Sequence, residues 1–322
     1  MGELLGRYNR IEGINNMAFK PQAPRTQPKT KSFNTPKESM AIPIDDDILD
    51  SVIDQGTDEG FNKKDPILVA FAGKKDTCKS GVIAELISHL PEGKIAVIMD
   101  FDHSMKPIAE EYFKIHMPKF LFINCTAFGK EYRRSLMVGL KALERTVDAR
   151  SSDIGVFCID GADRIKQRSF KSTLQARGIS IEDVSFFGKG GDKEFSPMDW
   201  MVRNDFNIDP FNIVYDYAAQ LGVDIIVSTH TRDDIDQSHK VIEEDVPIWH
   251  DIADELLYYT FITKRITKGY IVTRNMTCKK ARIKGDVYGD VHTILTHDTL
   301  NKTREFHGVY DYLKKNIEFP KW

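Results

Sequence analysis

The sequence has no long hydrophobic run, and none approaches the ~18–20 apolar residues of a transmembrane helix. Its start, Met1 to Leu5, lacks the layout of a secretory signal peptide. Cysteine is scarce, and Cys78, Cys125, Cys158 and Cys278 lack the C-x-x-C spacing of a zinc or redox site. These absences argue against a membrane-spanning protein and a disulfide framework. They predict a cytoplasmic protein, inside a host cell if its source is viral.

Charge is nearly balanced over the whole chain but is segregated near the amino end. The 322 residues are 41% hydrophobic and 29% charged, which is ordinary for a globular protein. Residues 1–42 carry seven Lys/Arg and three Asp/Glu, whereas residues 43–61 carry seven acidic residues and no basic one. We therefore expect residues 1–62 to form a flexible arm that contacts a neighbouring subunit or another protein. The alternative is a solvated tail.

A phosphate-binding loop is predicted where the apolar strand at 66–72 runs into a polar turn and then a helix. The pattern G-x-x-x-x-G-K-[ST] uses its first Gly for the turn, its Lys for the phosphates and its hydroxyl for Mg²⁺. Gly73, Lys79 and Ser80 take these places, but Cys78 replaces the second Gly, which adds a Cβ near the phosphate. We also expect the Cys78 thiol to ionise readily, because it lies at a helix amino end beside an ammonium group. The residues assigned to nucleotide binding are Gly73, Lys74, Lys75, Asp76, Thr77, Cys78, Lys79 and Ser80.

Three later segments read as apolar strands that end in polar side chains. Residues 95–99 lead to Asp102, residues 154–160 end in Asp160, and residues 223–232 contain Thr229 and His230. Ligands of doubly wound α/β sheets bind outside the carboxyl ends of the strands, so these side chains should surround the loop. An apolar strand that closes with Asp160 is a Walker B pattern. We therefore predict that Ser80 and Asp160 hold Mg²⁺.

Taken together, these spaced motifs resemble the ATPase core of RecA-like recombinases, especially their phage forms. The resemblance covers roughly residues 65–285, with little identity between the motifs. It rests on four segments: Gly73 to Ser80, Ile98 to Pro107, Val156 to Gly161, and Ile226 to Arg232. It implies an α/β fold: a RecA-like P-loop core at 63–298 with a mostly parallel central sheet flanked by helices. A C-terminal β-hairpin and a tail at 299–322 would complete the chain.

The resemblance also implies binding and hydrolysis of ATP with Mg²⁺. Asp102 would take the place of the Glu that activates the attacking water, Lys79 would contact the phosphates, and His230 would sense the γ-phosphate. Because Asp is shorter than Glu, we expect slow turnover. A hairpin after residue 258 carries Arg274, our candidate for a finger that reaches a neighbouring subunit, with Lys279 and Lys280 as reserves. The alternative is a basic hairpin that only faces solvent.

Nucleic-acid binding is expected in the segments that follow the strands at 154–160 and 223–232. Residues 164–177 contain five basic residues, no acid and a Phe, and residues 186–191 and Trp200 add aromatic groups, which suits single-stranded DNA. Residues 264–284 add eight basic residues and no acid. Residues 233–251 contradict the pattern, because seven acids there stand against one lysine.

Three functions therefore fit the sequence. The first is an ATP-dependent protein of DNA recombination or strand annealing that self-associates into a ring or filament on single-stranded DNA. The second is a RecA-like helicase or packaging motor, although no added helicase, nuclease or zinc domain is visible. The third is a structural or partner-binding protein with a degenerate nucleotide site.

Overall fold

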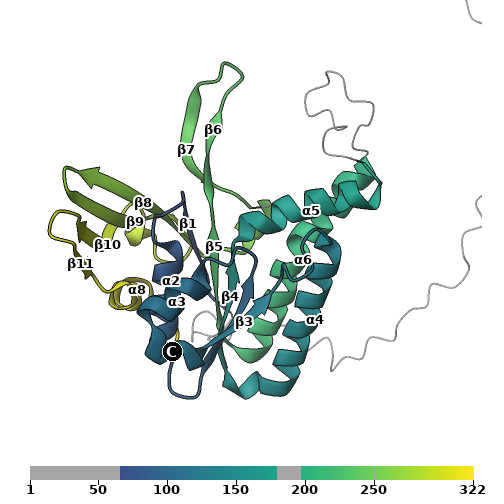
Figure 1. Ribbon diagram of the computed structural model, residues 1–322, viewed down its shortest axis with the longest axis horizontal. Helices are drawn as coiled ribbons and strands as arrows, with labels where there is room; N and C mark the ends of the chain where they lie inside the picture. Colours follow the sequence, from purple (N-terminus) through teal and green to yellow (C-terminus); the bar gives the residue numbers. More distant parts are fainter. Residues whose placement is uncertain (1–65, 180–196, 250) are drawn as a thin grey trace, which may run out of the picture. The chain divides into compact units, whose positions relative to one another are not determined.

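The computed structural model describes residues 66–179, 197–249 and 251–322 (Figure 1). The predicted arm at 1–62 and the aromatic segment Phe186 to Gly191 lie outside these residues. In the described part of the chain, no helix is long and apolar enough to cross a membrane.

The described residues form an α/β fold around one nine-stranded sheet, with the strand order β11-β10-β9-β8-β1-β5-β4-β2-β3. Six neighbouring strands run parallel, as the near-continuous apolar runs predict. They are β1 (Leu68–Gly73), β2 (Ile95–Asp100), β3 (Phe120–Asn124), β4 (Ile154–Asp160), β5 (Asp224–Thr229) and β8 (Tyr259–Lys268). In this order β5 lies between β1 and β4, and the predicted α/β fold with a mostly parallel central sheet flanked by helices is confirmed.

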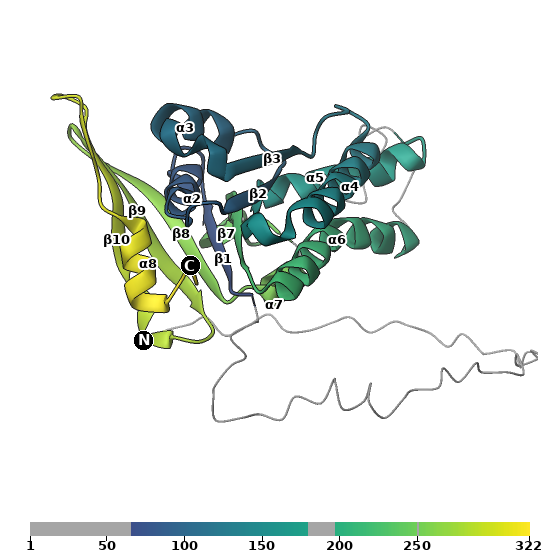
Figure 2. The same ribbon diagram turned by 90° about the horizontal axis from the view of Figure 1, so that it is seen from below.

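Helices cover both faces of the sheet (Figures 1 and 2). Alternate residues of each strand serve the two layers: Val69 and Phe71 join one core, and Leu68 and Ala70 join the other. The first layer is formed by α2 (Lys79–Ser88), α3 (Met105–Tyr112) and α8 (Val309–Ile317). The second is formed by α4 (Tyr132–Arg150), α5 (Ala162–Ala176), α6 (Pro197–Leu221) and α7 (Asp251–Leu256). Short 3₁₀ helices lie at Lys114–Lys119, Ser151–Asp153 and Gly285–Val287.

Two hairpins extend beyond the parallel core. β6 (Thr231–Ile235) and β7 (Val241–Pro247) form a separate two-stranded antiparallel sheet. The expected C-terminal hairpin is present as β8 paired with β9 (Ile271–Ala281). The sheet then continues antiparallel through β10 (Val291–Asp298) and β11 (Thr303–Phe306).

Several segments differ from the sequence-based expectation. The expected nucleic-acid loop at 164–177 is mostly helix α5, and much of 233–251 is the β6–β7 hairpin. Residues 299–322, predicted as a tail, include β11 and α8, and Val309, Leu313 and Phe319 lie in the hydrophobic core. The boundaries at 63 and 298 remain predictions.

Candidate functional site

The segment after β1, predicted to be a phosphate-binding loop, folds back around the Lys79 side chain. The Lys79 ammonium is buried and donates hydrogen bonds to the carbonyl oxygens of Gly73, at 2.9 Å, and Lys74, at 3.0 Å. A Cβ on Gly73 would collide with Thr263 and Thr77, so this position requires glycine. Thr77 closes the turn by donating to the Lys74 carbonyl at 2.8 Å. The loop is therefore wrapped around a lysine whose charge is available to an anion.

Cys78 adopts the left-handed conformation that the missing glycine would favour, with φ at 76° and ψ at 18°. Such a conformation costs an L-residue about 1–2 kcal/mol. The expectation of a readily ionised thiol is wrong. Burial raises the pKa of Cys78, and the opposing charges of Arg274 and Lys79 do not overcome it.

A chain of hydroxyl groups joins the loop to the Walker B carboxylate. Ser80 Oγ lies 2.9 Å from Ser104 Oγ, and Ser104 donates to Asp160 Oδ2 at 3.3 Å. Ser228 donates to Asp160 Oδ1 at 2.5 Å. Burial raises the pKa of Asp160 to about 6, although these hydrogen bonds oppose the shift. One carboxylate and three hydroxyl oxygens thus form one connected group, which is the oxygen-rich donor set that Mg²⁺ prefers.

Asp102 lies beside Asp160, but it is already engaged. Arg164 Nε on α5 donates to Asp102 Oδ1 at 3.0 Å, and the Asp102 side chain is 17% exposed. Gly161 allows this approach: its φ is +83°, and a Cβ there would lie 2.7 Å from Asp102 Cβ. Sequence reasoning found Asp102 and missed Arg164 as its partner.

His230 is held by Asp163, which the sequence analysis did not select as a site residue. Its Nδ1 lies 3.0 Å from Asp163 Oδ1, and its backbone N–H donates to the same oxygen at 3.2 Å. Although burial opposes it, the interactions with His230 lower the pKa of Asp163. Because Asp163 engages Nδ1, Nε2 is the ring nitrogen left for a ligand. Asp163 could have been selected from the sequence, because it lies three residues after the Walker B candidate Asp160.

The predicted residues gather around one pocket of about 420 Å³ at the carboxyl ends of β1, β2, β4 and β5. It is lined by Lys75, Asp76, Thr77, Cys78, Lys79, Ser80, Asp102, Ser104, Ile108, Gly161, Arg164, Ser228, Thr229 and His230. Gly73 and Lys74 contribute through their carbonyls, and Asp160 through Ser104. Burial lowers the pKa of Lys79, and the carboxylates of Asp163 and Asp102 oppose the shift.

A second cavity of about 340 Å³ adjoins the first, and Asp76, Cys78 and Ile108 line both. Its lining includes the aromatic side chains of Tyr112, Phe113 and Phe306, and it contains Arg274. Arg274 Nε donates to the Asp76 carbonyl of its own chain at 3.0 Å. The candidate finger therefore lies against the loop of the same chain. Lys280, one of the reserves, is paired with Asp254 at 2.8 Å.

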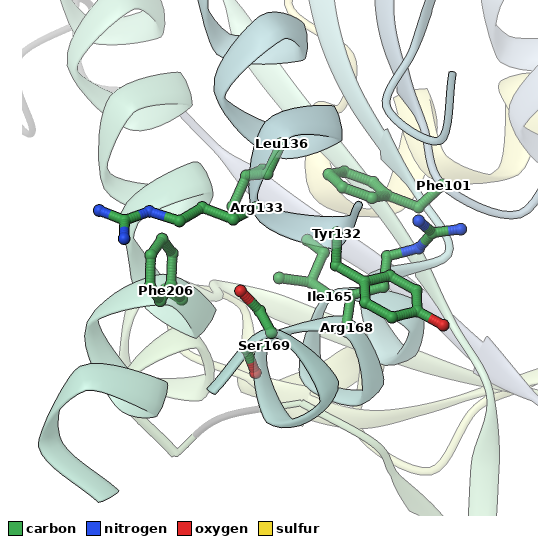
Figure 3. Close-up of a pocket in the computed structure, with 9 residues that line it drawn as sticks. Phe101, Tyr132, Arg133, Leu136, Ile165, Arg168, Ser169 and Phe206 are labelled. Carbon is green, nitrogen blue, oxygen red and sulfur yellow. The ribbon is translucent and has the colours of Figure 1, made fainter. Parts of the chain in front are cut away.

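A small cavity among α4, α5 and α6 lies apart from this site, and its volume of about 10 Å³ could hold no more than a water molecule (Figure 3). Two cation–aromatic pairs line it: Arg133 over the Phe206 ring at 5.2 Å and Arg168 over the Tyr132 ring at 5.5 Å. Arg168 Nη1 is buried and has no hydrogen-bond partner among the described residues, and burial lowers the pKa of Arg168. Nearby, Arg203 stacks on Trp200 at 4.8 Å.

No protein family matches the sequence, and neither does any curated protein. Among solved structures, the chain is similar to a KaiC-like protein from the hyperthermophilic archaeon Pyrococcus horikoshii OT3. The TM-score is 0.42 with 12% sequence identity, over 75% of this chain and 89% of that chain. A similarity at this level identifies neither a substrate nor a partner.

Proposed function

We propose that this chain binds ATP with Mg²⁺ and hydrolyses it. One observation carries the proposal: the loop lysine Lys79, the Asp160 hydroxyl chain, Asp102 and His230 converge on a single pocket from four strand ends. A strand followed by an accidental Lys-Ser turn would not bring these groups together. The pocket's volume of about 420 Å³ is within the usual range for a small-molecule site.

The residues fit the groups that such a reaction needs. Lys79 and the loop N–H groups would hold the phosphates, and Ser80 and Asp160 would hold Mg²⁺. When bound, the metal supplies positive charge that offsets the charge of the phosphate oxygens. The aromatic cavity beside Cys78 offers ring surfaces for the base.

We assign Asp102 and His230 to the γ-phosphate end of the bound nucleotide. Asp102 would accept a hydrogen bond from the attacking water, which requires Arg164 to release the carboxylate it now binds. His230 would donate Nε2–H to a phosphate oxygen, with Asp163 holding the ring orientation. Because the Asp102 carboxylate starts out ion-paired, slow turnover without a further partner is expected.

The same proposal includes action on single-stranded DNA in recombination or strand annealing. It is supported by the cation–aromatic pairs of α4, α5 and α6, since guanidinium groups with stacking rings suit phosphates and bases. A helicase or packaging motor would use the same surface. A degenerate, partner-binding site is the remaining alternative.

Steady-state ATP turnover with and without single-stranded DNA tests the proposal. We expect DNA to stimulate turnover, and Lys79→Ala to abolish it. Lys114→Ala, at an exposed lysine outside the site, is the matched control and should leave turnover unchanged. Nucleotide binding without turnover in either condition would instead favour the degenerate site.

A variant that loses stimulation by DNA but keeps basal ATP turnover would separate DNA binding from ATP hydrolysis. Arg168→Ala should reduce the stimulation and leave basal turnover intact, whereas Arg145→Ala, an exposed arginine on α4, should change neither. Equal stimulation in both variants would place the DNA elsewhere.

The role of Arg274 is a separate question, tested by mixing Arg274→Ala with Lys79→Ala subunits. A finger that acts across an interface predicts partial recovery of turnover, because an intact loop can meet an intact finger. Action on its own loop, where Arg274 lies in this chain, predicts no recovery.

A further inference from the structure

The β6–β7 hairpin concentrates negative charge. It contains six acidic residues against Arg232 and Lys240: Asp233, Asp234, Asp236, Glu243, Glu244 and Asp245. Asp234 and Glu243 stand directly opposite each other in the strand register. Like charges in this position destabilise a two-stranded ribbon, so a cation beside them would be favourable.

The β8–β9 hairpin has the opposite composition. It contains six basic residues and no acid: Lys264, Arg265, Lys268, Arg274, Lys279 and Lys280. Arg265 and Arg274 are register partners, so this hairpin also places like charges opposite each other. The two ribbons are therefore complementary in charge, and each is repulsive within itself.

The outer parts of both hairpins have few ion pairs among the described residues. Near the sheet, Lys264 pairs with Asp245 at 2.5 Å and Lys74 pairs with Asp233 at 3.0 Å. Farther out, Glu243 and Glu244 on one hairpin and Arg265 and Lys268 on the other have no ion pair in the part of the chain that the structure describes. Figure 1 gives the reason, because β6–β7 rises away from the nine-stranded sheet, whereas β8 and β9 continue that sheet to one side.

Exposed apolar side chains accompany the charges on both hairpins. Ile235, Val241 and Ile242 are at least half exposed, and Ile235 and Val241 are register partners. On the other hairpin, Tyr270 is 64% exposed at the turn between Ile266 and Ile271, which are also exposed. Apolar groups within a charged border are typical of protein-contact surfaces.

We propose that the acidic β6–β7 hairpin of one subunit docks on the basic β8–β9 hairpin of a second copy of this chain. The contact joins two different surfaces, so it is head-to-tail and builds either a closed ring or an open filament. A second copy fits better than nucleic acid, because both complementary hairpins are present on every chain. The proposal does not rest on nucleotide binding.

Charge reversal tests it in the full chain without nucleotide, with molar mass as the readout. The acidic-reversed variant is Asp234→Lys with Glu243→Lys, and the basic-reversed variant is Arg265→Glu with Lys268→Glu. Wild type should form assemblies at multiples of 36.8 kDa that weaken as salt is raised. Each variant should raise the dissociation constant about 30-fold, because two attractive pairs become repulsive.

Mixing gives the sharpest result. In an equimolar mixture of the two variants, each hairpin again meets the opposite charge, so assembly should return. A chain that carries both reversals should self-associate like wild type. The matched control, Glu92→Lys with Asp148→Lys, reverses two exposed acids outside the hairpins and should behave as wild type.

Several outcomes would overturn the proposal. They are a monomeric wild type at low salt and high concentration, reversed variants with unchanged mass, a mixture that stays monomeric, or a control that loses mass as much as the variants. If the basic-reversed variant keeps its mass but loses affinity for a single-stranded oligonucleotide, the basic hairpin serves nucleic acid instead. Failure of nucleotide binding would leave this mass measurement unaffected, so the two proposals fail separately.

Discussion

Two buried aspartates on neighbouring strands differ in the kind of partner that holds them. Asp160 is the last residue of β4, and Asp224 is the first residue of β5. The two side chains therefore lie at opposite ends of these parallel strands. Burial raises the pKa of both. Asp224 accepts backbone N–H groups from Ile67 at 3.1 Å and Lys321 at 2.8 Å, whereas the partners of Asp160 among the described residues are the hydroxyl groups of Ser228 and Ser104.

This difference separates a structural carboxylate from one that can serve a ligand. A hydroxyl group rotates to another acceptor at little cost, but a backbone N–H cannot turn away without moving the chain. Asp224 therefore ties the start of β1 and the Lys321 segment to β5. Asp160 can exchange its partners when a cation arrives.

The largest expected effect is at Asp160. Asp160→Asn removes the negative charge proposed to hold Mg²⁺, so turnover should fall by about 10²- to 10³-fold. The free energy of unfolding should change by less than about 1 kcal/mol, because a buried charge is removed while the side-chain shape is kept. Steady-state turnover and urea unfolding measure the two quantities. Unchanged turnover would remove Asp160 from the site.

At Asp224 we expect the reverse, a large loss of stability with no effect on the nucleotide site. Asp224→Ala leaves two backbone N–H groups without their acceptor, so the free energy of unfolding should fall by about 2–4 kcal/mol. Nucleotide affinity, measured below the unfolding transition, should stay as in wild type. Weakened nucleotide binding in a folded Asp224→Ala protein would contradict the division between the two ends of the sheet.

A smaller effect is expected at Asp163, which touches His230 and does not line the pocket. Asp163→Ala should lower kcat about tenfold, because the His230 ring loses a hydrogen bond that sets its orientation. The KM for ATP should change little. Thr173→Ala on the same helix, a buried residue whose hydroxyl donates to the Ser169 carbonyl, serves as a control for altered helix packing. An equal loss of kcat in this control would assign the effect to packing.

The smallest effect concerns Cys78. A glycine there should be more stable than an alanine by about 1 kcal/mol, because only the alanine meets the left-handed strain that Cys78 bears. Comparing the urea unfolding of Cys78→Gly and Cys78→Ala measures the cost of this backbone strain separately from the loss of the thiol. Equal stability of the two variants would show that the loop relaxes out of this conformation.

The sequence predicted the parallel core and the strand-end residues well, because apolar runs and phosphate-loop spacing are local signals. It missed α5, because the family resemblance assigned the basic residues at 164–177 to a nucleic-acid loop. It also missed the β6–β7 hairpin, whose strands are largely exposed on both faces and so show no apolar alternation.

Pairings between residues far apart in the sequence could not be predicted either. Arg164 meets Asp102 and Asp163 meets His230 across 62 and 67 positions, which only the folded sheet brings together. The ionisation of Cys78 was predicted wrongly for a related reason. Its local sequence shows the helix and the lysine but not the burial that raises the pKa.

The central claim is that Lys79 and its loop hold a triphosphate while Asp102 acts only on the attacking water. Calorimetric titration with Mg²⁺ and a non-hydrolysable ATP analogue tests it directly. One site per chain is expected in wild type, with affinity about 100-fold weaker in Lys79→Ala and unchanged in both Asp102→Asn and the control Lys114→Ala. Equal affinity in Lys79→Ala and Lys114→Ala, or equal loss in Lys79→Ala and Asp102→Asn, would contradict the account.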